Sequence, residues 1–301
     1  MISAIGLTKH YGKIKAVDNI SFEIGSGEII GFLGPNGAGK TTTMQMLTCY
    51  LSPTAGNANI SGYDIMQYPV EIKKLIGYLP ENNPLYNELS VYDFLLYFGK
   101  LKGIENKKVK DEIVSVAEKC SIKDVLGRKI DTLSKGYRQR VGLSQAILGN
   151  PEILILDEPT VGLDPNQIVE IRDLIKSLGK EKTVILSTHI LQEVEQTCDR
   201  VIIIHKGKIA KDEKLLNLTA QTIEYLIETE PKMKKSIIEQ FGNVIYEENN
   251  KYIIESSSDI RRKLSEVCLQ NQILILELTR RKKSLEDIFR SITLEASNEI
   301  H

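Results

Sequence analysis

The chain has 301 residues, of which 42% are hydrophobic and 26% are charged, and its formal net charge is −1. This composition is ample for one large domain and a smaller one, and it offers no global basic field for nucleic acid. The four cysteines are about seventy residues apart and form no C-x-x-C pair or Cys/His cluster, so we expect reduced cytosolic thiols rather than metal ligands.

Residues 1–28 alternate between apolar and polar side chains around turn residues, which predicts antiparallel strands. Residues 59–63 continue with another short strand and a turn. We expect these segments to form an antiparallel β subdomain. Between them, residues 29–33 form an apolar run that predicts a buried strand.

Residues 34–41 follow this strand, read G-P-N-G-A-G-K-T and match the pattern G-x-x-x-x-G-K-[ST]. A helix is predicted next, over residues 42–50. In this order the glycines let backbone N–H groups turn toward phosphates, Lys40 reaches the terminal phosphates and the Thr41 hydroxyl faces Mg²⁺. The pattern alone is compatible with GTPases, kinases, helicases and transport ATPases. The residues expected to contact the nucleotide here are Gly34, Pro35, Asn36, Gly37, Ala38, Gly39, Lys40, Thr41 and Thr42.

The segment from about residue 83 to residue 148 is mostly helical by its apolar period, and glycines interrupt it. It predicts a helical subdomain. Its aromatic side chains either line a groove for a helix of a partner protein or belong to the core, and their helical spacing favours the core for most of them. These aromatic residues are Tyr86, Tyr92, Phe94, Tyr97 and Phe98.

The sequence L-S-K-G-Y-R-Q-R begins at residue 133 and opens a helix expected to run to Leu148, with Ser134 as its N-cap. It is a second helix start suited to bind phosphate. Residues 152–158 then form a buried-strand pattern that ends in Asp157 and Glu158. Asp157 is placed to hold Mg²⁺, as on a Walker B strand, and Glu158 to face the water that attacks a γ-phosphate. The alternative is an ordinary surface pair of carboxylates.

Residues 183–189 form another β-branched strand, which ends in His189. Its ring is placed to reach a γ-phosphate. For this histidine taken alone, a capping or packing role would be the default, and its position after a strand favours the functional interpretation.

The pattern changes beyond Asp212. The expected elements are strand, helix, strand, strand, helix and strand, over residues 223–228, 232–241, 244–247, 252–256, 259–271 and 274–278. This βαββαβ order predicts a small ferredoxin-like α+β domain. A last helix, over residues 284–294, follows the basic residues 280–283, which either contact anionic lipid headgroups or, as we favour, form a solvated turn.

Taken in this order, the elements resemble the ATP-binding subunit of an ABC transporter, over roughly residues 1–212. The sequence L-S-K-G at residues 133–136 is similar to the LSGGQ signature, residues 162–164 are similar to the D-loop, and His189 falls on the switch histidine. A narrower resemblance, carried by residues 77–86 and 157–167, is to the gliding-motility-associated ABC ATP-binding subunits.

The resemblance implies an α/β fold. The expected parts are a P-loop NTPase over residues 1–214, with a RecA-like core, an antiparallel β subdomain and a helical subdomain, and the accessory domain over residues 215–301. It also implies ATP and Mg²⁺ as cofactors and two ATP molecules between two subunits arranged head to tail. In that arrangement Tyr11 stacks on adenine, and Ser134 and Gly136 contact the phosphate bound by the other subunit. Asp164 belongs to the D-loop at the same interface.

Two positions depart from the family pattern. Lys135 and Tyr137 stand where the signature usually has Gly and Gln, and we expect activity to survive because Ser134 and Gly136 are retained. At the Q-loop, Glu81 replaces the usual Gln and brings an anionic oxygen toward Mg²⁺. Glu81 is therefore either a neighbour of the metal or part of a coupling loop.

The expected reaction is ATP hydrolysis by in-line attack of water on the γ-phosphate, with Glu158, His189 and Lys40 as the catalytic residues. The apolar runs are far shorter than the ~20 residues that span a bilayer, and no signal-peptide core is present. We therefore expect the chain in the cytoplasm, at the cytoplasmic face of the cell membrane, bound to a separate membrane-spanning permease of an exporter or gliding-motility system. The alternative is a soluble ABC-type ATPase acting on ribosomes or DNA, which one P-loop and the lack of a heptad run disfavour.

Overall fold

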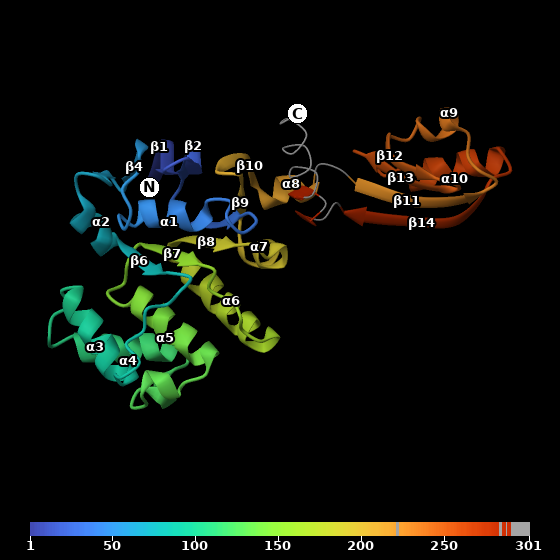
Figure 1. Cartoon of the computed structure of the whole chain (residues 1–301). Helices are drawn as coiled ribbons and strands as arrows, with labels where there is room; N and C mark the ends of the chain where they lie inside the picture. Colours follow the sequence, from blue (N-terminus) through green and yellow to red (C-terminus); the bar gives the residue numbers. More distant parts are fainter. Residues whose placement is uncertain (221–222, 283–284, 287, 290–301) are drawn as a thin grey trace. The chain divides into compact units, whose positions relative to one another are not determined.

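A computed structural model describes residues 1–220, 223–282, 285–286 and 288–289. The chain divides into two compact units, Met1–Asp212 and Glu213–His301 (Figure 1). No helix in the described ranges is long and apolar enough to cross a membrane.

An antiparallel sheet begins the N-terminal unit, as predicted. Its strands are β1 (Ile2–Tyr11), β2 (Ile14–Ile24), β4 (Ala55–Ile60) and β5 (Tyr63–Asp64), in the order β2-β1-β4-β5. The backbones of β1 and β4 approach so closely that a Cβ added to Gly56 would lie 2.0 Å from the carbonyl oxygen of Gly6. Both glycines also have positive φ, so this crossing requires residues without a side chain.

A six-stranded sheet forms the centre of the unit, in the order β10-β9-β3-β8-β7-β6. Its strands are β3 (Ile29–Leu33), β6 (Ile76–Leu79), β7 (Ile153–Asp157), β8 (Thr183–Thr188), β9 (Arg200–His205) and β10 (Lys208–Lys214). All residues of β3, β7 and β8 are buried, which is typical of parallel strands covered on both faces. The pairs β6–β7, β7–β8, β8–β3 and β3–β9 are parallel, so the carboxyl ends of these strands meet at one edge.

Helices cover both faces of this sheet (Figure 1). They include α1 (Lys40–Leu47), α2 (Pro69–Leu75), α6 (Pro165–Gly179) and α7 (Leu191–Thr197). Each face of the sheet has its own hydrophobic core, and successive side chains of β7 point into different cores. Ile155 packs in the cluster that contains Met44 of α1, whereas Leu156 packs in the cluster that contains Ile171 of α6. The helix predicted over residues 42–50 thus begins at Lys40, directly after the glycine-rich loop.

The predicted helical subdomain is present between β6 and β7. It contains α3 (Val91–Leu101), α4 (Val109–Lys119), α5 (Lys135–Ile147) and two short 3₁₀ helices, η1 (Lys123–Val125) and η2 (Ile130–Thr132). Ser134 is the N-cap of α5, as predicted, and its Oγ accepts a hydrogen bond from the backbone N–H of Tyr137 at 3.4 Å.

The aromatic side chains of this subdomain divide into two groups. Phe94 is 2% exposed, and Tyr92 and Phe98 pack against the core, so the core interpretation is confirmed for these three. Tyr86 and Tyr97 are 47% and 44% exposed, with their ring centroids 5.8 Å apart. The second group forms an exposed aromatic surface.

The C-terminal unit begins with α8 (Leu215–Ala220) and contains one four-stranded antiparallel sheet. The elements that follow are β11 (Ile223–Glu230), α9 (Lys235–Ile238), β12 (Asn243–Glu248), β13 (Lys251–Ser256), α10 (Arg261–Gln270) and β14 (Leu274–Lys282). The strand order is β12-β13-β11-β14. The predicted βαββαβ sequence of elements is confirmed, and this strand order supports the ferredoxin-like assignment.

One prediction for this unit was wrong in extent. The helix expected over residues 232–241 is reduced to α9, because the Tyr252 hydroxyl accepts a hydrogen bond from Met233 N at 2.9 Å and donates one to Met233 O at 3.3 Å. These contacts engage the backbone groups that would start a longer helix. The helix predicted over residues 284–294 lies mostly outside the described residues.

The basic cluster at residues 280–283 is not a solvated turn over its described part. β14 extends to Lys282, and Arg281 Nε lies 2.7 Å from the buried carboxylate of Glu224 on β11. The pairing of a buried acid with an arginine on the neighbouring strand explains why the strand is longer than expected.

Candidate active site

Three motifs that are distant in the sequence meet at the carboxyl edge of the parallel sheet. They follow β3, β7 and β8, which are adjacent in the order β3-β8-β7. Together with the start of α1 they border an open cleft of about 670 Å³. The residues that line it are Ala16, Asn36, Gly37, Gly39, Lys40, Thr41, Thr42, Glu81, Glu158, Val161 and His189. Ala16 and Val161 carry no motif signal in the sequence, and they reach the cleft only through the fold.

The glycine-rich loop has a backbone that side chains would obstruct. Gly37 and Gly39 have φ of +77° and +109°, which L residues rarely adopt. A Cβ on Gly39 would lie 2.5 Å from the Ala16 carbonyl oxygen, and one on Gly34 would lie 2.3 Å from the Ile204 carbonyl oxygen. The loop is thus packed tightly between β2 and β9 and leads directly into α1, whose N-terminus favours an anion.

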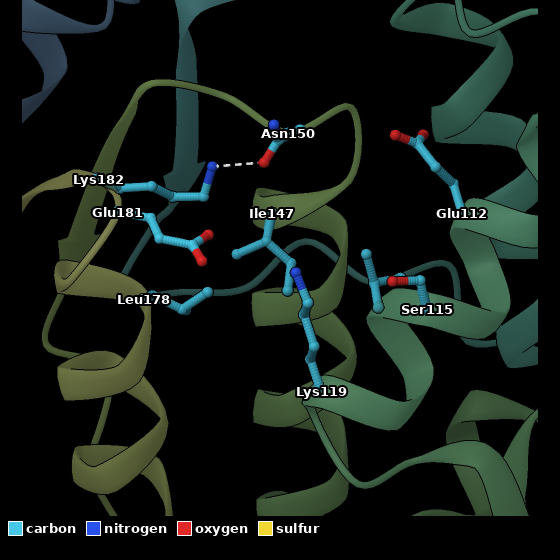
Figure 2. A pocket seen from close by; sticks show the side chains of 9 residues that line it. Glu112, Ser115, Lys119, Ile147, Asn150, Leu178, Glu181 and Lys182 are labelled. Carbon is cyan, nitrogen blue, oxygen red and sulfur yellow. Dashed lines mark hydrogen bonds between the residues drawn. The ribbon is translucent and has the colours of Figure 1, made fainter.

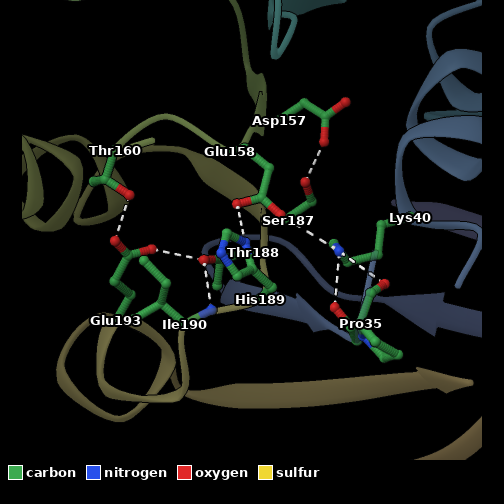
Figure 3. A network of polar contacts seen from close by, with 11 residues as sticks. Pro35, Lys40, Asp157, Glu158, Thr160, Ser187, Thr188, His189, Ile190 and Glu193 are labelled. Carbon is green, nitrogen blue, oxygen red and sulfur yellow. Dashed lines mark hydrogen bonds and ion pairs between the residues drawn. The ribbon is translucent and has the colours of Figure 1, made fainter. Parts of the chain in front are cut away.

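Lys40 is almost fully buried in this loop. Its Nζ donates hydrogen bonds to the carbonyl oxygens of Gly34 at 2.8 Å and Pro35 at 3.3 Å, and lies 3.4 Å from Oε1 of Glu158 (Figure 3). The ammonium group is therefore fixed in place by the loop, with a carboxylate as its counter-ion.

Glu158 connects the loop after β7 to the loop after β8. Its second oxygen, Oε2, lies 2.9 Å from Nδ1 of His189. The Glu158 carboxylate is 5% exposed, whereas the His189 side chain is 43% exposed. The backbone of Glu158 has a φ of +49°, an unfavourable conformation for a residue with a side chain, and its N–H donates to the Ser187 carbonyl oxygen at 3.0 Å. The surrounding structure holds this strained residue so that its carboxylate points between Lys40 and His189.

Asp157 is fully buried beside this pair. Its Oδ1 accepts a hydrogen bond from the Ser187 hydroxyl, but Oδ2 has no hydrogen-bond partner among the described residues. Burial raises the pKa of Asp157, the hydroxyls of Ser187 and Thr41 oppose this, and the nearby Glu81 and Glu158 raise the pKa further. A buried carboxylate oxygen without a donor is suited to a hard cation.

The residues around Asp157 fit a magnesium ion. Asp157 itself is not among the residues that line the cleft, whereas the Thr41 hydroxyl and the Glu81 carboxylate border it and supply oxygen donors, which Mg²⁺ prefers. Across the described part of the chain, no three Asp, Glu, His or Cys side chains are grouped as a cage for a metal. Magnesium usually keeps few protein ligands and takes the rest from phosphates and water, so this donor set agrees with a metal that arrives with a nucleotide.

Seven predicted nucleotide-binding residues are not among those that line the cleft: Gly34, Pro35 and Ala38, which belong to the phosphate loop itself, and four residues outside that loop. Tyr11, at the end of β1, is 47% exposed, and Lys9 Nζ is 5.7 Å from its ring centroid. Ser134 and Gly136 lie at the start of α5, and Asp164 is the N-cap of α6, where its Oδ1 accepts from Gln167 N at 3.0 Å. The structure of one chain does not bring these four residues to the phosphate loop.

The segment that resembles the signature contacts both the segment that resembles the D-loop and the first turn of α6. A Cβ on Gly136 would lie 2.5 Å from Cδ of Gln167, and one on Gly162 would lie 1.9 Å from Nζ of Lys135. The unusual Lys135 of the signature therefore lies directly on the D-loop backbone.

A buried polar network lies near the cleft, and the sequence gives no sign of it. Thr160 and Thr188 both donate hydrogen bonds to the carboxylate of Glu193 on α7 (Figure 3). No motif includes Glu193, and an acidic residue on a short helix resembles a surface residue when only the sequence is considered. Its burial depends on the approach of two loops from different strands.

A second hollow, of about 370 Å³, lies between α4, the end of α5 and the end of α6 (Figure 2). Lys182 borders it and donates from Nζ to Asn150 Oδ1 at 2.7 Å and Pro151 O at 2.6 Å. Burial lowers the pKa of Lys182. Carboxylates and ammonium groups alternate around its rim, and none of the motif residues reaches it, so we assign it no ligand.

A glycine-rich loop before a helix, a buried aspartate and glutamate at the end of β7 and a histidine after β8 define a P-loop nucleotide-binding protein. Residues 17–161 match the family model described as ABC transporter. YxlF, an uncharacterized ABC transporter ATP-binding protein of Bacillus subtilis (strain 168), is 34% identical over 97% of this chain and 99% of its own length. The bacitracin transport ATP-binding protein BcrA of Bacillus licheniformis is 37% identical over 96% of each chain. The chain belongs to the family of ABC transporter ATP-binding proteins, and it is an ATPase.

Solved structures agree with this family. The dimeric ATP-binding cassette MJ0796, in a post-hydrolysis state bound to ADP and Pi, is 25% identical with a TM-score of 0.66, and the match covers 71% of this chain and 99% of that one. The predicted α/β fold of a P-loop ATPase is thereby confirmed. The ferredoxin-like assignment of the C-terminal unit stays a prediction. The relatives do not favour a ribosome- or DNA-associated ATPase.

Proposed function

We propose that this ATP-binding subunit drives an exporter: two copies close around two Mg²⁺–ATP and act on a separate membrane-spanning permease at the cytoplasmic face of the membrane. The observation that carries the proposal is the contact of the buried Glu158 carboxylate with both Lys40 and His189, beside the Asp157 oxygen that has no hydrogen-bond partner among the described residues. The similarity to a bacitracin transport protein supports export. The gliding-motility subtype stays a prediction from resemblance.

The phosphates bind first to the loop. Backbone N–H groups that follow Pro35 in this loop and the Lys40 ammonium receive the β- and γ-phosphates. Thr41 and Asp157 would hold Mg²⁺, with Glu81 at its edge. When bound, the metal neutralises negative charge that develops on the transferred phosphoryl group.

Glu158 then acts on water. Once phosphate oxygens replace Glu158 as the partner of Lys40, the Glu158 carboxylate is free to accept a proton from the attacking water. The water oxygen forms a bond to the γ-phosphorus, the bond to the β-phosphate bridging oxygen breaks, and ADP leaves with that electron pair. His189, in contact with Glu158 and exposed toward the cleft, donates a hydrogen bond to the γ-phosphate.

The second copy completes the site. Ser134, Gly136 and Asp164 lie off the cleft of their own chain, which supports a role for them at the nucleotide of the other copy. The related cassette MJ0796 is dimeric. Tyr11 stacks on the adenine in this proposal.

The permease binds near the helical subdomain. The exposed aromatic surface of Tyr86 and Tyr97 lies in the segment that follows Glu81, and large exposed aromatic side chains are enriched at protein interfaces. We infer that movement at Glu81 couples the nucleotide site to this surface.

The test uses the Glu158→Gln variant, tagged and trapped with ATP in its native cells. We expect a polytopic membrane protein to co-purify after gentle solubilisation, with Lys40→Ala as the matched control that does not trap nucleotide. Recovery of only ribosomal or DNA-associated proteins with the trapped variant would overturn transport and leave the ATPase chemistry intact.

A further inference from the structure

Glu193 is a buried carboxylate that no catalytic role uses. It lies in the first turn of α7 and is 6% exposed. Its Oε1 accepts a hydrogen bond from the Thr160 hydroxyl, and its Oε2 accepts one from the Thr188 hydroxyl at 2.7 Å (Figure 3). Thr188 Oγ1 also accepts from the backbone N–H of Ile190 at 3.1 Å. One carboxylate oxygen is thus bound to the loop after β7 and the other to the last residue of β8.

The two threonines flank the reacting pair. Thr160 lies two residues after Glu158, and Thr188 lies immediately before His189. Thr160 is 5% exposed and Thr188 is fully buried. The Glu193 carboxylate therefore fixes the distance between the loop that carries Glu158 and the loop that carries His189.

Three other contacts join these segments, and two of them use groups that must change partners. Asp157 is bonded to Ser187, and the Glu158 carboxylate is bonded to His189. The third is the hydrogen bond from the backbone N–H of Glu158 to the Ser187 carbonyl oxygen, which holds only the main chain. Asp157 is the proposed metal ligand, while Glu158 and His189 are the groups proposed to meet water and phosphate. The contacts of Glu193 involve none of these groups, so they can persist while nucleotide binds and reacts.

Burial of a carboxylate is unfavourable unless hydrogen bonds compensate, and here two hydroxyl donors do so in a fixed geometry. To bind both threonine hydroxyls at once, the side chain at position 193 needs two acceptor atoms spaced as the two oxygens of a carboxylate are. An apolar residue would fill the space but would not fix the two loops relative to each other.

We propose that Glu193 is a positioning residue for hydrolysis, which holds Glu158 and His189 in register through Thr160 and Thr188. The inference rests on the roles proposed above for Glu158 and His189. Since misplacement of a reacting group by about 1 Å costs on the order of 10²-fold in rate, loss of this bridge lowers kcat without removing the phosphate-binding groups.

The experiment compares kcat, KM for ATP and the affinity for a fluorescent ATP analogue in purified full-length variants. Glu193→Ala is expected to lower kcat by about 10- to 100-fold with KM and nucleotide affinity within about threefold of the parent. Glu193→Gln keeps the length and one acceptor and is expected to recover part of the loss. Glu195→Ala, an exposed acid on the same helix, is the matched control and keeps the parent kcat.

A second pair of variants avoids any doubt about folding. Thr160→Val removes one hydroxyl without changing the shape of the side chain and is expected to lower kcat, whereas Thr160→Ser restores it. When Thr160→Val is added to Glu193→Ala, kcat should fall no further, because Glu193→Ala already removes the hydrogen bond that Thr160 makes.

Parent kcat in Glu193→Ala, or equal kcat in the Val and Ser variants of Thr160, would overturn the inference. Equal losses in kcat and in nucleotide affinity would also overturn it, because they indicate damage to the whole site. The Glu158→Gln variant distinguishes failure of this inference from failure of the proposed function. Full turnover in Glu158→Gln would show that Glu158 is not the base, which rejects the proposed function. An inactive Glu158→Gln together with parent kcat in Glu193→Ala would reject only the positioning role of Glu193.

Discussion

The ammonium of Lys40 lies 3.4 Å from the carboxylate of Glu158, and both side chains are only 5% exposed. The group proposed to receive the phosphate is therefore already paired with the group proposed to activate water. Phosphate binding separates them, so the base becomes available only when the substrate is present. This ion pair determines how substitutions at Lys40 or Glu158 should affect turnover and stability.

Glu158→Gln is expected to bind ATP and to lose about 10²- to 10⁴-fold in kcat, the scale of a general base. The amide keeps the size of the side chain and a hydrogen bond to His189, but it cannot accept a proton from water. Steady-state phosphate release, together with nucleotide affinity, checks this. Parent turnover in this variant would exclude Glu158 as the base.

Lys40→Ala should abolish hydrolysis, since the phosphates lose their fixed ammonium. It also leaves the Glu158 carboxylate buried without its cation, and breaking a buried pair in this way typically costs about 3 kcal/mol or more. Urea unfolding measures the loss. In the double variant with Glu158→Gln, the stability loss should be smaller than the sum of the single losses, because the two groups interact. Additive losses, or normal ATPase activity in Lys40→Ala, would contradict this account.

Magnesium binding should weaken as the pH falls. The pKa of Asp157 is raised, mainly by burial, so protons compete for its carboxylate at higher pH than for an ordinary aspartate. A raised folded-state pKa also means that the metal-free protein loses stability as the pH rises through that pKa, and a bound cation offsets this loss.

Melting temperatures with and without Mg²⁺–nucleotide, from mildly acidic to alkaline pH, check both effects. The metal-dependent increase should be largest at alkaline pH and should be lost in Asp157→Asn. A chelator should abolish hydrolysis in the parent. A metal-dependent increase that grows as the pH falls would show that Asp157 is not the ligand.

Gly162→Ala should destabilise the chain by about 1–2 kcal/mol. The residue has a φ of +72°, and a Cβ there would lie 1.9 Å from Lys135 Nζ, so both backbone strain and a displaced side chain contribute. Gly127→Ala is the control, because an added Cβ meets nothing within 4 Å. Chemical denaturation of both variants decides the matter, and equal stability would show that the D-loop relaxes freely.

The sequence was informative wherever function depends on short spacing. A strand end and a few neighbouring residues are enough to recognise the loop at residues 34–41 and the pair Asp157–Glu158. Their local patterns therefore predicted that both lie at the nucleotide site. The match of His189 to a switch histidine came from resemblance to a family, and the strand order that brings it beside Glu158 was not predicted.

Long-range contacts explain what was missed. The helix near Met233 is short because Tyr252, on another strand, engages its backbone. β14 is long because Arg281 pairs with Glu224. Glu193 is buried because Thr160, from the loop after β7, and Thr188, at the end of β8, converge on it. In each case the deciding partner is distant in sequence, and no periodicity reveals it.

The short strand β6 gives the edge of the sheet a mechanical property. Leu79, its last residue, is paired in register with Leu156, so Glu81 lies two residues beyond this pair and Asp157 lies one residue beyond it. The connection between the segment after Pro80 and the end of β7 is therefore very short. Because a close-packed interior deforms little, movement of that segment displaces the neighbouring strand. The end of β7 that carries Asp157 is the first part of the sheet to be displaced.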